Sequence, residues 1–202
     1  MNQGTTGRQK IVSLIHDKGI LRSRELAQHG IPRAELSKLC HDGTVQRVSR
    51  GLYRLTNMRL SEHATITEAS AAVPHGVICL LSALRFHDLT TQAPYEVWMA
   101  IAVKAHLPRI SLPVKFVRFS GAALSEGVEH HVIDSVPIKV YNLPKTIADC
   151  FKYRNKIGLD VALEALREAR KGSRCTIDDL WRYAKVCRVS NVMRPYLEAL
   201  SI

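Results

Sequence analysis

The stretch that decides the fold runs from Gly19 to Arg54 and reads GILRSRELAQHGIPRAELSKLCHDGTVQRVSRGLYR. Glycines and a proline divide it into short segments, at the residue types that commonly end or begin helices and turns. A helix capped by Thr5 or Thr6 is expected before this stretch. Within it we expect helices over residues 23–30 and 32–42, and then a β-hairpin that turns at Gly51. This order predicts a winged helix-turn-helix.

The third helix has two different faces. At about 100° per residue, one side gathers Leu36, Leu39, Cys40 and Gly43, which predicts a buried face. The opposite side carries Ala34, Ser37, Lys38 and His41, with Arg33 on the flank. In a major groove, arginine and lysine could donate to guanine, the serine to a base or a phosphate, and the alanine could touch a thymine methyl group. An ordinary solvated helix face is the alternative.

The hairpin after this helix is basic. Arg50 stands at its expected tip, and a basic hairpin directly after a recognition helix is typical of a wing that contacts phosphates or the minor groove. The predicted DNA-binding residues come from the second helix, the third helix and the hairpin. They are Arg22, Ser23, Arg24, Arg33, Ala34, Ser37, Lys38, His41, Arg47, Arg50, Tyr53 and Arg54.

Charge supports a polyanionic partner. The chain has 202 residues and a net charge of +11. Residues 1–59 hold eleven basic and four acidic residues, and residues 60–202 hold eighteen and fourteen, so most of the excess lies in the first third. We therefore expect double-stranded DNA as partner. The N-terminus lacks an apolar signal segment and no apolar run reaches membrane-helix length, which favours a cytoplasmic protein without a membrane partner.

The same stretch resembles the N-terminal winged helix of the AbiEi antitoxin family. That family's pattern is Leu-Arg-x-x-Asp/Glu-Leu, a Gly-Ile turn, Arg-x-x-Leu-x-x-Leu, and Gly-x-x-x-Arg-Val-x-Arg-Gly-x-Tyr. Every element is present here, within residues 21–53. Residues 82–84 and 143–151 resemble two landmarks of the family's second domain more weakly.

The resemblance implies a function. Proteins of this family repress their own operon by binding inverted repeats, and they counteract a toxin similar to nucleotidyltransferases without a tight direct complex. It therefore implies a repressor and antitoxin of a toxin–antitoxin system in phage defence, acting as a monomer or as a weak dimer that pairs on DNA. We expect it not to be an enzyme.

The remaining sequence predicts a larger domain. We expect a winged helix over residues 1–57 and a mixed α/β domain over 58–202, with a helical C-terminal part, so the fold class is α+β. Strands are expected over 77–79, 96–103, 114–119, 128–133 and 136–141. Asn142, Asp160 and Thr176 are expected to cap helices, and a last helix is expected either to span 190–200 or to begin at Pro195.

No motif in this domain predicts catalysis. The nearest candidates for a metal-dependent nuclease are Glu96, Glu129, Asp134 and Lys139, but they lack a recognisable spacing. We expect no metal and no cofactor. The five cysteines form no CxxC pair. His130 and His131 are adjacent on a strand and point to opposite faces, so we expect them to be exposed polar residues and not metal ligands. A basic stretch is expected to be a solvated helix end, with nucleic-acid contact as the alternative. It consists of Lys145, Lys152, Arg154 and Lys156.

Two other functions stay open. One is a regulator whose second domain senses a small ligand, and the other is a nucleic-acid-processing enzyme that the winged helix directs to its target.

Overall fold

The computed structural model describes residues 4–200 and divides into two compact units. Unit 1 comprises Met1–Pro74, Pro108–Leu112 and His131–Ile138. Unit 2 comprises His75–Leu107, Pro113–His130 and Lys139–Ile202. With both helices and sheets the chain is α+β, as expected.

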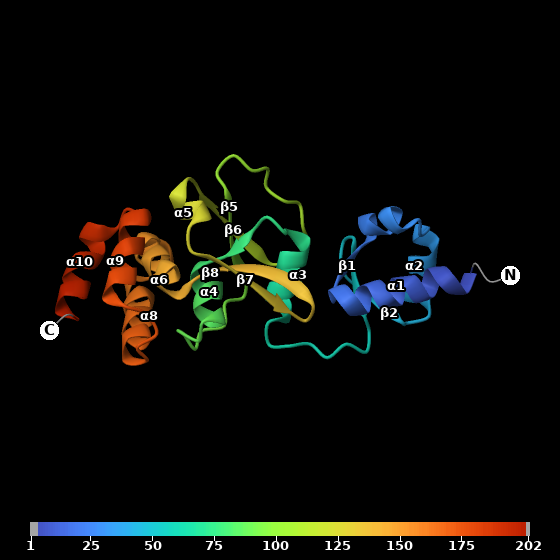
Figure 1. Ribbon diagram of the computed structural model, residues 1–202, viewed down its shortest axis with the longest axis horizontal. Helices are drawn as coiled ribbons and strands as arrows, with labels where there is room; N and C mark the ends of the chain where they lie inside the picture. The colour runs from blue at the N-terminus through green and yellow to red at the C-terminus, as the bar shows by residue number, and fades with distance from the viewer. Residues whose placement is uncertain (1–3, 201–202) are drawn as a thin grey trace. The chain divides into compact units, whose positions relative to one another are not determined.

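Unit 1 begins with helices around a small sheet (Figure 1). Its sheet has the strand order β1-β3-β2, and both pairs are antiparallel. Apolar side chains from these elements, with Ile31 from the turn between η1 and α2, form one buried cluster, because the helices and the sheet each turn one apolar face inward. The elements are α1 (Gly4–Lys18), β1 (Leu21–Arg22), the 3-10 helix η1 (Ser23–His29), α2 (Arg33–His41), β2 (Val45–Ser49), β3 (Leu52–Leu55) and α3 (Ala64–Ala72).

Two helix starts differ from expectation. The chain is already helical at Gly4, ahead of the expected threonine cap of α1. The second helix is a 3-10 helix in which Ser23 is the first residue and not the cap. The physical reason is strand pairing: Arg22 pairs with Leu52, and the Ser23 amide donates to the carbonyl of Gly51 at 2.9 Å. Ser23 is therefore held by the hairpin.

The strands of the second sheet follow the order β6-β5-β4-β8-β7. β4 runs antiparallel to β5 and parallel to β8, while β5 and β6 are parallel, so the sheet is mixed. β5 is buried along almost its whole length, which agrees with its apolar sequence. The strands are β4 (Val77–Ile78), β5 (Val97–Ala102), β6 (Val114–Phe119), β7 (Val128–Ile133) and β8 (Val136–Tyr141).

Unit 2 ends in packed helices, with α6, α8, α9 and α10 lying together at the orange and red end of the chain in Figure 1. α6 is buried along nearly its whole length. Its buried face and those of α4, α8 and α9 share one apolar cluster with β5 and β6. The helices are α4 (Leu80–Phe86), α5 (Ala122–Ser125), α6 (Leu143–Lys152), α7 (Arg154–Ile157), α8 (Leu159–Lys171), α9 (Ile177–Val186) and α10 (Ser190–Ala199).

Helix ends in unit 2 test the predicted caps. Asn142 accepts a hydrogen bond from the amide of Lys145 at 3.0 Å, and Thr176 forms a complete capping box, so both predictions are confirmed. The prediction for Asp160 was wrong. Gly158 is the cap of α8, because its positive φ of 95° turns the chain before the helix, and Asp160 lies in the first turn.

Pro195 does not begin the last helix. It lies inside α10, which spans Ser190–Ala199. A proline inside a helix costs about 3 kcal/mol. Met193 and Leu197, both fully buried, pack this helix on the core and offset that cost.

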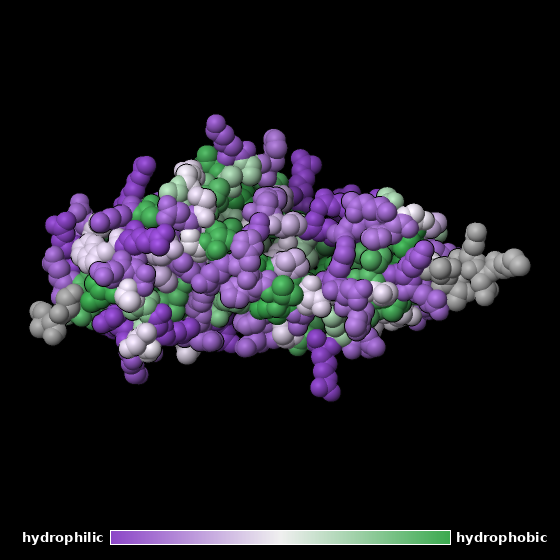
Figure 2. Space-filling model, viewed as in Figure 1, coloured by the Kyte–Doolittle hydropathy of each residue, from purple (hydrophilic) through white to green (hydrophobic). Residues whose placement is uncertain are grey.

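Hydrophilic side chains cover most of the face drawn in Figure 2, and hydrophobic ones form small separate groups. Within residues 4–200, no helix combines the length and the apolar character that crossing a membrane requires.

Candidate nucleic-acid interface

α2 presents one polar face to solvent. Its apolar side chains Leu36 and Leu39 are buried, and Pro32 precedes the helix in an extended conformation. The five side chains predicted to read DNA are all exposed: Arg33, Ala34, Ser37, Lys38 and His41. The helical period therefore separated the two faces of α2 correctly.

Two contacts organise this face. Lys38 Nζ forms an ion pair with Glu35 Oε1 at 2.7 Å, while the Lys38 side chain stays 62% exposed. Ser37 Oγ lies 3.4 Å from the carbonyl oxygen of Arg33, to which it donates. Both polar groups remain at the surface, where an incoming acceptor can replace their present partners.

The hairpin of β2 and β3 turns at Arg50 and Gly51. Gly51 has a φ of 77°, a conformation that favours glycine, and an added Cβ atom would lie 3.3 Å from Ser23 Oγ. Arg50 and Arg47 are exposed, and Arg47 Nε donates to the carbonyl of Ser49 at 3.2 Å. A register shift between Arg47 and Ser49 bends the strand next to the turn.

Two predicted DNA contacts are instead bound within unit 1. The guanidinium of Arg22 donates from Nε (2.7 Å) and from Nη2 to the carbonyl of Ala71, in the last turn of α3. Burial, and secondarily Arg24, lowers the pKa of Arg22. Arg54 Nη1 pairs with Glu68 Oε1 at 2.8 Å, and both side chains are largely buried. Burial raises the pKa of Glu68, which Arg54 opposes.

The other predicted residues are exposed or half-buried. Arg24 is exposed, Ser23 is half-buried, and Tyr53 is half-buried against the apolar cluster of unit 1. Tyr53 also pairs across the sheet with Leu21 and Arg47, so its ring supports the hairpin.

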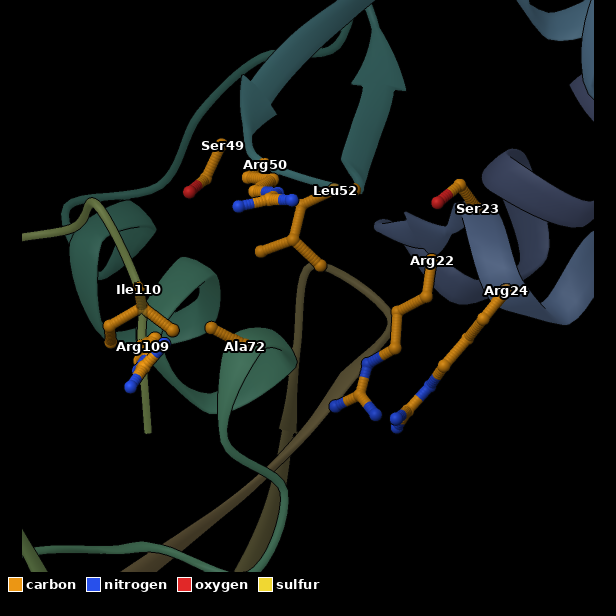
Figure 3. Close-up of a pocket in the computed structure, with 10 residues that line it drawn as sticks. Arg22, Ser23, Arg24, Ser49, Arg50, Leu52, Ala72, Arg109 and Ile110 are labelled. Carbon is orange, nitrogen blue, oxygen red and sulfur yellow. The ribbon is translucent and has the colours of Figure 1, made fainter. Parts of the chain in front are cut away.

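A basic pocket of about 220 Å³ opens beside the hairpin (Figure 3). Arg22 enters it from the end of β1, Arg24 from the start of η1 and Arg50 from the hairpin. Its lining consists of Arg22, Ser23, Arg24, Ser49, Arg50, Gly51, Leu52, Ala72, Arg109 and Ile110.

Arg109 is the member of this pocket that sequence reasoning missed. It lies on the segment Pro108–Leu112, where the hydroxyls of Ser49 and Ser111 are 2.9 Å apart and hydrogen-bonded. A single arginine between Pro108 and Ile110 carries no motif, so only folding brings it to the hairpin.

The residues considered for a nuclease site do not form a metal-binding group. Among residues 4–200, no three histidine, cysteine, aspartate or glutamate side chains come together as potential metal ligands. Asp134 lies in the β7–β8 turn with a φ of 51° and accepts a hydrogen bond from Ser61 Oγ at 2.6 Å. The turn and the hydrogen bond to Ser61 therefore account for the position of Asp134.

The basic stretch after Asn142 was only partly a solvated helix end. Lys152 and Lys156 are exposed, and Arg154 donates to the carbonyl of Phe151. Lys145 contradicts the prediction, because it is fully buried and its Nζ lies 2.5 Å from Asp149 Oδ2. The missed signal is an opposite charge four residues later on the same helix face.

Buried groups surround this ion pair. The Lys145 ammonium lies 4.0 Å from the ring centre of Tyr141 and 4.9 Å from that of Phe119. Cys187 Sγ donates to Asp149 Oδ1 at 3.2 Å. Burial raises the pKa of Asp149, and Lys145 opposes that rise. The ion pair lies within α6, and the hydrogen bond from Cys187, the C-cap of α9, links the end of α9 to it.

Comparison with known proteins identifies the first part of the chain. Residues 9–56 match a family of transcriptional regulators. That family is described as "Transcriptional regulator, AbiEi antitoxin", so these residues form an AbiEi-type domain and the resemblance is confirmed there. The match ends at residue 56, before α3. Comparison with curated proteins gives no match.

Proposed function

We propose that this protein is a sequence-specific DNA-binding repressor that regulates its own operon, with residues 1–57 as a winged helix-turn-helix. The observation that carries the proposal is the exposed polar face of α2 beside an arginine-bearing hairpin, within the AbiEi-type domain. In this reading α2 enters the major groove and the hairpin is the wing.

α2 supplies the sequence-reading contacts in this proposal. Arg33 and Lys38 donate to guanine O6 and N7, and Ala34 contacts a thymine methyl group. Ser37 and His41 bond to bases or to the phosphates next to them. Lys38 exchanges the Glu35 carboxylate for the DNA acceptor when it binds.

The pocket beside the hairpin supplies phosphate contacts. Arg24, Arg50 and Arg109 are exposed cations around one concave surface, which suits the sugar-phosphate backbone. Arg22 and Arg54 support them indirectly, because their guanidinium groups tie β1 and β3 to α3. Arg47 lies on the exposed side of β2 and reaches the same backbone.

The partners follow from the family and from symmetry. We propose an inverted-repeat operator bound by two copies, each a monomer or a weak dimer in solution. We further propose that the protein is a non-enzymatic antitoxin that counteracts a cognate nucleotidyltransferase-like toxin without a tight direct complex. The antitoxin description of the matching family supports this role.

A gel-shift titration against the promoter upstream of the gene, with random duplex DNA as competitor, tests the repressor. Lys38→Ala should weaken operator binding by about 1–3 kcal/mol and random-DNA binding much less. Arg50→Ala should weaken both alike and reduce the salt dependence. Lys171→Ala, an exposed cation at the end of α8, is the matched control and should bind as the wild type does.

Two outcomes would overturn the proposal. Equal losses on both DNAs for Lys38→Ala, and likewise for Ser37→Ala, would remove both residues as readers of the operator sequence. Absence of any preference for the promoter would favour a nucleic-acid-processing enzyme instead.

A further inference from the structure

Unit 2 contains a second basic pocket, of about 420 Å³. It lies between the end of β6, the start of α5 and the C-terminal ends of α6 and α9. Its described lining residues include four cations and no carboxylate: Arg118, Phe119, Ser120, Gly121, Ala122, Ala123, Lys152, Tyr153, Lys185, Val186 and Arg188. This volume lies within the range of small-molecule sites, about 300–1,000 Å³.

Three of the four cations are available to a ligand. Arg118 uses Nη1 to donate to the carbonyls of Val103 at 2.6 Å and Ala105 at 2.9 Å, so it is anchored in place. Lys152, Lys185 and Arg188 are exposed, and none of their side chains makes a hydrogen bond or an ion pair with the described part of the chain. Like charges therefore converge on this pocket without a neutralising partner.

Helix dipoles do not account for this charge. Lys152 lies in the last turn of α6 and Lys185 in the last turn of α9, where cations are favoured. Each helix end is equivalent to about half a negative charge, so two ends offset about one of the four positive charges. A substantial positive excess remains.

Arg188 occupies a backbone position that favours glycine. Its φ is 58°, and it follows the end of α9. The amide of Val189 bonds to the carbonyl of Ala184, and that of Arg188 to the carbonyl of Lys185, which is the Schellman pattern. Glycine is the common residue at this position because it lacks a Cβ atom. An arginine here costs backbone energy and gains a cation at the pocket.

Tyr153 is an aromatic residue that lines the pocket. Its hydroxyl is directed to the carbonyl of Arg118, at 3.4 Å, and its ring is half-buried. Burial, with Asp149 as the next contribution, raises the pKa of Tyr153 to about 12, so the phenol stays neutral and does not repel an anion. An aromatic ring beside converging cations suits a base that carries phosphates.

We propose that this pocket binds a polyphosphate-bearing small molecule, with Lys152, Lys185 and Arg188 on the phosphates and Tyr153 beside the group that carries them. The polyphosphate can belong to a nucleotide or be free. This site lies wholly within unit 2 and does not depend on DNA binding by unit 1.

Isothermal titration of the full chain with ATP and with inorganic tripolyphosphate tests the proposal. Both should bind, and Lys185→Ala and Arg188→Gly should each weaken binding about tenfold, as expected for loss of one charge-assisted contact. Arg188→Gly should leave the melting temperature unchanged or higher, because glycine suits that backbone position. Lys171→Ala, outside the pocket, is the control.

Comparing ATP with tripolyphosphate shows whether the site recognises a nucleotide or a free polyphosphate. Tighter binding of ATP assigns the site to a nucleotide, with Tyr153→Ala removing the difference, whereas equal binding assigns it to the polyphosphate alone. Absence of heat up to about 1 mM ligand would overturn the proposal. Binding that Lys185→Ala and Arg188→Gly leave unchanged would overturn it as well.

Discussion

Two lysines in this protein have an acidic partner on the same helix, and they have opposite environments. Lys38 of α2 pairs with Glu35, three residues earlier, and is 62% exposed. Lys145 of α6 pairs with Asp149, four residues later, and both side chains are 0% exposed. The local sequence pattern is nearly the same in the two helices. The difference therefore comes from what packs against each helix.

Exposure to water determines how much each ion pair contributes to the stability of the fold. In water an ion pair contributes little, so Lys38 can exchange Glu35 for another anion at small cost. Inside the core, each charge has lost its hydration and depends on its partner. Lys145 thus contributes to the stability of unit 2 and is not accessible to a partner, whereas Lys38 is exposed and available for binding.

Removing one member of the buried pair should give the largest effect. Asp149→Ala leaves the Lys145 ammonium without its carboxylate, and we expect a loss of about 3–5 kcal/mol in the free energy of unfolding. Denaturant titration followed by circular dichroism measures it.

A double variant tests whether the unpaired charge causes this loss of stability. Replacing both charges by apolar residues, Lys145→Met with Asp149→Leu, should recover most of the lost stability, since no unpaired charge remains. A loss under about 1 kcal/mol for Asp149→Ala alone would contradict the assigned role.

Removing the N-cap of α9 should lower the stability by an intermediate amount. Thr176→Ala removes the hydroxyl that accepts from the Asp179 amide at 3.0 Å, and it should cost about 1 kcal/mol. Thermal unfolding of both proteins measures the difference. A cost equal to that of Asp149→Ala would mean that burial does not distinguish local from core contacts in unit 2.

The same capping box predicts a pH dependence. Hydrogen bonds from Thr176 lower the pKa of Asp179, so its contribution to stability is present above its ordinary pKa near 4 and is lost as the pH falls through the lowered value. Melting temperatures of the wild type and Asp179→Asn should differ at neutral pH and converge in acid. A constant difference across the titration would contradict this.

Breaking the Lys38–Glu35 pair, whose lysine is exposed and whose glutamate is half-buried, should have the smallest effect on the fold. Glu35→Ala should change the free energy of unfolding by no more than about 0.5 kcal/mol. It also removes a negative charge from the proposed DNA face, so operator affinity should rise slightly. A loss of several kcal/mol would show that this pair, like the buried one, supports the fold.

Sequence reasoning succeeded where local rules decide. The helical period predicted that Leu36 and Leu39 are buried, and the Thr176 and Asn142 caps could be read from neighbouring residues. It failed for Lys145, because a lysine is seldom buried unless paired and the partner was overlooked. It could not find Arg109, which reaches the hairpin only through folding.

By itself, the sequence determined the strands of the second sheet, the buried face of α2 and the AbiEi character of residues 9–56. These properties depend on residues close together in the chain. Tertiary structure alone decided which cations are free. Arg22 bonds to a carbonyl 49 residues away, and Arg118 and Arg188 meet at one pocket. The availability of a charge depends on its partner and its hydration, and both are set by contacts between distant segments.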